Sequence, residues 1–135
     1  MSSRDLGLST LDEAAWISMC DPSGAVLAGI EGQAATLLEK ADGSFIGADF
    51  IRMQPGAAFA LHVHHGDHIL YIIGGSGYVF IDGRDIRVTI GHVVHIPAER
   101  PHRVWVADEA RVPLTLLSIG HPHAAVTSAE RMSLA

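Results

Sequence analysis

Two short stretches decide the fold: FALHVHHGDHILY, residues 59–71, and HIPAERPHRV, residues 95–104. Alternate residues of a β-strand point to the same face of the sheet, so His62 and His64 are expected to present two imidazoles side by side. A glycine-aspartate turn follows, and it brings His68 to the start of the returning strand, close to the first pair. Three imidazoles are therefore expected at one place.

The second stretch adds a fourth imidazole, because His102 opens a further expected strand. Imidazole is a ligand for Zn, Fe, Ni, Cu and, less strongly, Mn. The sequence therefore predicts one divalent transition metal per chain, bound by His62, His64, His68 and His102. The alternative is a histidine-rich face without a metal.

At these positions the chain resembles the cupin superfamily in both of its motifs. The first motif is matched by Gly56, five residues, His62-Val63-His64, three residues, His68, six residues and Gly75. The second is matched by Gly91, five residues, Pro97 and then His102. The resemblance covers residues 53–106 closely. It implies a jelly-roll β-barrel in which two His and a Glu from the first motif and a His from the second hold one metal.

Three positions depart from the family pattern. His68 stands where the family usually has Glu, Glu99 where a Gly is expected, and Val106 where an Asn is expected. The first departure changes the chemistry of the site, since it gives four histidines in place of three histidines and a carboxylate. The other two lie outside the ligand set, and we expect them to affect loop geometry and packing only.

Composition limits the class of protein. The chain has 135 residues, of which 48% are hydrophobic and 18% charged, so one domain over residues 1–135 with a buried core is expected. A net charge of −6 without a basic cluster argues against nucleic acid as a partner. Neither a membrane helix nor a signal peptide is evident, and the single Cys20 has no internal disulfide partner, so a cytoplasmic protein is expected.

Turn residues divide the chain into many short β-rich segments, which is typical of an all-β sandwich or barrel. We expect the barrel over about residues 25–120, with hairpin turns at Asp42-Gly43 and Asp82-Gly83. A capping box that begins at Ser9 predicts a short helix over about residues 9–19, with Trp16 on its buried face. The tail, residues 121–135, loses the pattern and is expected to be a loose arm or a dimer contact.

Strand alternation also predicts what surrounds the metal. The side chains expected on the same faces as the four histidines are apolar: Ala60, Leu70, Ile72, Val104 and Val106. They suggest a hydrophobic cavity for a small molecule, although the same residues would also serve as plain barrel core. The other histidines are expected to be bystanders at the surface or beside the ligands, with the two in the tail solvated: His65, His92, His95, His121 and His123.

Four neutral imidazoles would not compensate the double positive charge of the metal. In octahedral geometry they would also leave two coordination positions open. A small hydrophobic 1,3-dicarbonyl fits such a site. With Zn the favoured reaction is an aldol-type cyclisation, and the chain resembles cupin-type aromatic polyketide cyclases that hold Zn through four histidines. With Fe, Cu or Mn the alternative is an O2-dependent dioxygenase, as suggested by small Mn-binding cupins; Ni is a further possible metal. A metal- or ligand-binding sensor without catalysis is a third possibility, and a homodimer is expected in each case.

Overall fold

The computed structural model describes residues 15–124, 128 and 131–135, and the regular elements in these ranges are all β-strands. The first sheet has the order β1-β2-β3-β10-β5-β8. Its strands are β1 (Ile17–Cys20), β2 (Val26–Glu39), β3 (Phe45–Met53), β10 (Leu114–His121), β5 (Asp67–Gly74) and β8 (Val93–Ile96). The second sheet has the order β11-β4-β9-β6-β7. Its strands are β11 (Ser133–Leu134), β4 (His62–Val63), β9 (His102–Trp105), β6 (Ser76–Ile81) and β7 (Arg84–Thr89).

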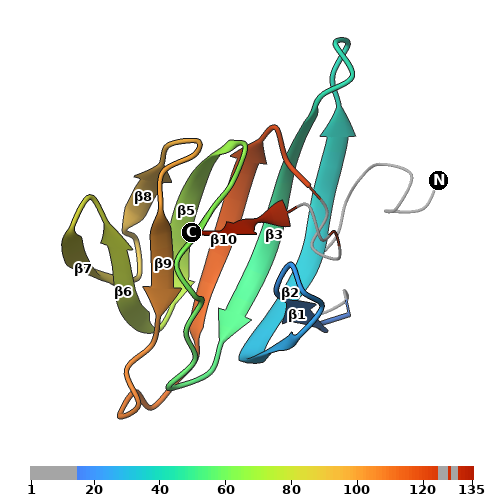
Figure 1. Ribbon diagram of the computed structural model, residues 1–135. Coiled ribbons are helices and arrows are strands. Elements are labelled where there is room, and N and C mark those ends of the chain that lie inside the picture. Colours follow the sequence, from blue (N-terminus) through green and yellow to red (C-terminus); the bar gives the residue numbers. More distant parts are fainter. Residues whose placement is uncertain (1–14, 125–127, 129–130) are drawn as a thin grey trace.

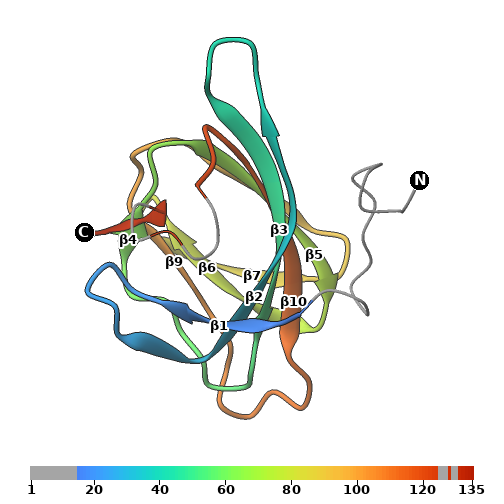
Figure 2. The ribbon, with the colours of Figure 1, turned by 90° about the vertical axis from the view of Figure 1, so that its right-hand side faces the viewer.

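The two sheets face each other and enclose one core, as the view in Figure 2 shows. This is the all-β jelly-roll barrel predicted from the sequence, and that prediction is confirmed. The β2–β3 hairpin projects beyond the other strands in Figure 1. No helix among the described residues is long and apolar enough to cross a membrane.

Alternating side chains explain why these segments form strands that bury one face. In β10 the residues from Leu114 to Ser118 alternate between buried and half-buried positions, and β6 follows the same rule around Val79 and Ile81. The inward residues of both sheets pack into one cluster, which includes Met53, Ile72, Val79, Leu114 and Leu116. Burial of this apolar surface stabilises the barrel and fixes the strand register, because a shift by one residue would expose the whole set.

The hairpin between β6 and β7 follows the turn chemistry in the sequence. Asp82 and Gly83 both have positive φ angles, 54° and 73°, and Ile81 pairs directly with Arg84. Such a two-residue turn matches the twist of the strands that it joins. The hairpin expected at Asp82-Gly83 is therefore present.

The N-terminal helix is not borne out where the structure describes the chain. Residues 9–14 lie outside the described residues, and Ile17–Cys20 forms strand β1, in which Ile17 pairs with Gly32 of β2. Pairing with the edge of the sheet overrides the local helix signal. Trp16 is half-buried, and the guanidinium of Arg52 lies 4.2 Å from the centre of its ring.

The tail is also different from the loose arm that was expected. Its described residues include the end of β10, strand β11, which pairs with β4, and the buried side chains of Arg131 and Met132. In Figure 2 the C-terminus lies beside β4. The loose arm is therefore wrong, because the contact of Arg131 with the buried Asp49 holds this segment and leaves no periodic pattern in the sequence, whereas the dimer contact stays a prediction.

Candidate metal centre

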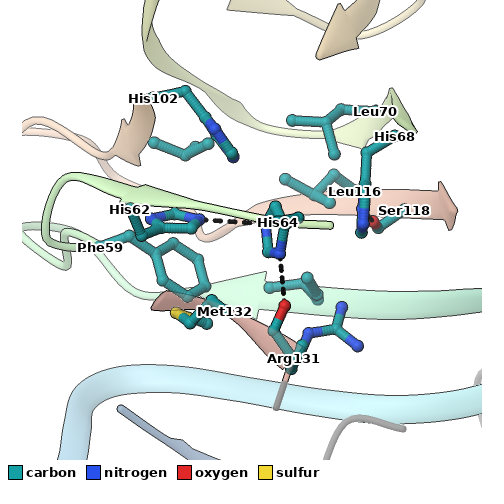
Figure 3. A pocket seen from close by; sticks show the side chains of 12 residues that line it. Phe59, His62, His64, His68, Leu70, His102, Leu116, Ser118, Arg131 and Met132 are labelled. Carbon is teal, nitrogen blue, oxygen red and sulfur yellow. Dashed lines mark hydrogen bonds between the residues drawn. The ribbon is translucent and has the colours of Figure 1, made fainter. Parts of the chain in front are cut away.

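Four buried histidines gather between the two sheets (Figure 3). His62 lies in β4 and pairs across the sheet with His102 at the start of β9, and His64 follows β4 immediately. The ligand atoms of these three imidazoles lie within 4.8 Å of one another. The structure therefore brings together two residues of the first motif and one of the second.

Backbone carbonyls orient each of these three rings. Nδ1 of His62 donates to the carbonyl oxygen of Ala60 at 2.7 Å, and Nδ1 of His102 donates to that of Arg100 at 2.9 Å. Nδ1 of His64 donates to the carbonyl oxygen of Arg131 at 2.6 Å. A ring whose Nδ1 carries the proton has a free lone pair on Nε2. Each ring therefore offers Nε2 to the centre, where Nε2 of His62 and Nε2 of His64 are 3.1 Å apart.

His68 lies in the same pocket but is arranged differently. Its ring stacks on that of His64, with centroids 4.2 Å apart and planes 20° from parallel, and its Nδ1 lies 3.1 Å from the hydroxyl oxygen of Ser118. It does not belong to the group of three converging ligand atoms. The predicted fourth ligand is thus adjacent to the centre, and its role as a ligand stays a prediction.

Burial keeps these imidazoles neutral. Desolvation, reinforced by the neighbouring histidines, lowers the pKa of His62 and of His64 to about 3. Desolvation and the charge of Arg131 lower the pKa of His68 to about 3, and desolvation lowers the pKa of His102. A neutral imidazole is the form that binds a metal, so the donor set is ready to bind one near neutral pH.

Apolar side chains cover most of the inner cavity, which measures about 30 Å³. Besides the four histidines it is lined by Ile51, Phe59, Leu70, Val104, Leu116, Ser118, Arg131 and Met132. Leu70 and Val104 were expected there. Ile72 and Val106 are buried in the barrel core and do not line the cavity.

The expected position of Ala60 in the cavity wall is wrong. Ala60 is exposed, whereas Phe59 is buried and lines the cavity. The segment before His62 bends at Leu61 and is not a regular strand, so the alternation that placed Ala60 inward does not apply there. What Ala60 contributes is its carbonyl oxygen, the partner of His62.

A buried polar cluster adjoins the histidines and was not expected from the sequence. Asp49 Oδ2 accepts hydrogen bonds from Nε2 of His123 and from Nη1 of Arg131, both at 2.6 Å. Burial raises the pKa of the Asp49 carboxyl, but the hydrogen bond from His123 and the charge of Arg131 outweigh it and hold the pKa below its usual value. The ring of His123 lies 5.5 Å from that of His68, centroid to centroid. His123, expected to be solvated, is therefore buried.

Part of this cluster had a signal in the sequence. Asp49 stands on the inward face of β3, two residues before Ile51, and Ser118 stands two residues after Leu116 on β10. A polar residue at an inward position of an apolar strand indicates a buried polar contact. Arg131 and His123 had no such signal, because they follow the last regular strand pattern.

The remaining histidines lie away from the centre. His65 is exposed and bonds to Glu99 at 2.7 Å, and His95 is exposed beside Asp67. His92 accepts a hydrogen bond from the backbone N–H of Thr89 at 2.9 Å. His121 lies near Lys40 and Ser44.

Comparison with known proteins identifies the family. The cupin domain model matches residues 49–120, more than half of the chain, and the chain belongs to the cupin family. An uncharacterised protein of Methanocaldococcus jannaschii is 31% identical over 68 residues, which cover 50% of this chain and 53% of that protein. The chain thus spans about half the length of this curated relative.

Solved structures support the fold. KdgF from Halomonas sp. superposes with a TM-score of 0.69 at 19% identity, over 85% of this chain and 94% of that one. The polyketide cyclase RemF from Streptomyces resistomycificus superposes with a TM-score of 0.71 at 16% identity, over 86% and 79%. A predicted oxalate decarboxylase from Thermotoga maritima gives 0.65 at 20% identity, over 84% and 96%. At these identities the likeness concerns the fold.

Proposed function

We propose that the chain is a metal-dependent enzyme that cyclises a 1,3-dicarbonyl or polyketide substrate by an aldol-type reaction. The observation that carries the proposal is the convergence of three neutral, buried imidazoles whose Nδ1 atoms are all tied to backbone carbonyls. This donor set fits a divalent transition metal, and we favour Zn²⁺. When bound, the metal would supply a Lewis acid that polarises carbonyl oxygens.

The residues of the chain would hold, shield and orient the substrate. Phe59, Leu70 and Val104 would cover its apolar part and keep water out. The likeness to RemF, a polyketide cyclase, supports this choice among cupin activities.

The inner cavity sets a limit on how the substrate binds. Its volume of about 30 Å³ suits little more than an ion with one or two waters. A second, outer pocket of about 280 Å³ shares His64, His68 and Arg131 with it. We infer that only the reacting carbonyls approach the histidines and that the rest of the substrate occupies the outer pocket.

The test is turnover of a poly-β-ketone by zinc-loaded protein, with product analysis and an oxygen electrode in the same sample. We expect a cyclised product without oxygen consumption. Strict dependence on O2, with activity only in the Fe or Mn form, would instead indicate a dioxygenase. Absence of turnover with any of these metals would favour a sensor.

Two matched histidine variants serve as controls. His102→Ala should lose metal and activity together, whereas His121→Ala should keep both, because His121 lies beside Lys40 and Ser44 and lines neither pocket. Full activity in His102→Ala would show that the metal is incidental. Homodimer formation and a cytoplasmic location remain predictions from the sequence.

A further inference from the structure

Arg131 stands at the boundary between the two pockets. Its side chain is buried, with 6% of the residue exposed, and it lines both the inner cavity and the outer pocket. Figure 3 shows its guanidinium on the side of the cavity where His68 and Ser118 lie. No Asp or Glu lines either pocket among the described residues.

Asp49 accepts a hydrogen bond from only one nitrogen of the Arg131 guanidinium. Nη1 of Arg131 donates to Asp49 at 2.6 Å and to the carbonyl oxygen of Ala124 at 3.1 Å. A guanidinium also has donors on Nη2 and Nε, arranged as a fork that matches a carboxylate. The same Asp49 oxygen is shared with His123. Within the described residues the guanidinium donates to these two acceptors through Nη1, which leaves Nη2 and Nε for a second acceptor.

The charge balance of the site favours an anion as that acceptor. Asp49 and Arg131 together are neutral, and burial keeps the four imidazoles uncharged. A divalent metal on neutral imidazoles would leave the interior positive, and in a buried site an anionic ligand would compensate this charge.

We propose that Arg131 binds a carboxylate of the substrate, so that the substrate class is the 3-oxo carboxylates and their longer poly-oxo homologues. The inference rests on the proposed function for the dicarbonyl part and on Arg131 alone for the carboxylate. In a 3-oxo carboxylate one carbon atom separates the ketone carbonyl from the carboxylate. The carboxylate can then lie at Arg131 while the ketone oxygen approaches the histidines.

The experiment compares binding of acetoacetate with that of its neutral methyl ester, by calorimetry on zinc-loaded and metal-free protein. A bidentate, charge-assisted hydrogen bond is worth about tenfold or more in affinity. We expect both forms of the wild-type protein to prefer acetoacetate by about this factor. Equal affinity for the acid and the ester in the metal-free form would overturn the proposal, because zinc alone can favour the anion.

Substitutions separate binding from a structural role of Arg131. Asp49→Asn leaves Arg131 without its acid and should keep or increase the preference for acetoacetate. The double variant Asp49→Asn/Arg131→Gln removes both charges, so it leaves no unpaired buried ion, and in its metal-free form it should bind acid and ester equally. If the metal-free double variant keeps the preference of the metal-free wild type, Arg131 does not bind the carboxylate.

Zinc content of each variant reports whether the histidine site is intact. Arg131→Lys keeps the positive charge but loses the forked pair of donors, and we expect a preference for acetoacetate between those of the wild type and the double variant.

The experiment measures binding and not turnover. A preference for acetoacetate can therefore hold even where cyclisation fails, and the two proposals can fail separately.

Discussion

At the scale of single residues, two glycines make room for the buried cluster. Gly120 of β10 pairs with Gly47 of β3, and the ring of His123 rests against both. A Cβ on Gly120 would lie 2.5 Å from Nδ1 of His123 and 3.0 Å from two atoms of the His68 ring. Neither ring can easily retreat, because Asp49 holds His123 and Ser118 contacts His68.

We therefore predict that Gly120→Ala lowers the free energy of unfolding by about 2 kcal/mol, the usual cost of overpacking a core. Gly74→Ala is the matched control, since its Cβ would meet Thr115 at ordinary contact distances of 3.4 and 3.5 Å. Urea unfolding followed by fluorescence measures both variants. Equal stability of the two variants would mean that the His68–His123 contact tolerates displacement.

At the scale of strands and loops, some features of the structure could be predicted from the sequence and others could not. The motif spacings and the alternation within β5 and β9 place His62, His64, His68 and His102 in one pocket, because strand periodicity is a local property. The first strand and the tail could not be predicted in this way. Their structures depend on pairing with β2 and β4 and on the Asp49–Arg131 contact, which joins residues 82 positions apart.

The β6–β7 hairpin permits a test of local turn chemistry. Gly83 has a φ of 73°, and a Cβ there would meet nothing within 4 Å. Gly83→Ala should therefore lower the free energy of unfolding by about 1 kcal/mol through backbone strain alone. Gly83→Asn should stay closer to the wild type, because Asn tolerates positive φ better. Thermal unfolding of the two variants measures the difference, and equal losses would exclude backbone strain as the cause.

At the scale of the whole molecule, the neutral histidines link folding to pH. Burial holds the pKa of His62, His64 and His68 at about 3, and that of His102 below its usual value. In the unfolded chain each would take up a proton at about pH 6.5. Below that pH the unfolded state binds more protons than the folded state, so stability falls as pH falls.

We predict that the metal-free protein is most stable above about pH 6.5 and loses up to about 1.4 kcal/mol per pH unit below it for each of these four histidines. Urea midpoints at pH 7.5, 6.5, 5.5 and 5.0 measure the slope. His102→Gln should reduce the slope by about one proton. A flat profile between pH 7 and 5 would show that the histidines are not held neutral.

The three carbonyls that orient the ligand rings also bear on how this site can evolve. They belong to the main chain of Ala60, Arg100 and Arg131, and every amino acid carries the same carbonyl. A mutation at Ala60 or Arg100 therefore changes a side chain without removing the acceptor that fixes the imidazole. The ring orientation is inherited with the path of the backbone, and the pocket walls can diverge toward new substrates while the centre stays the same.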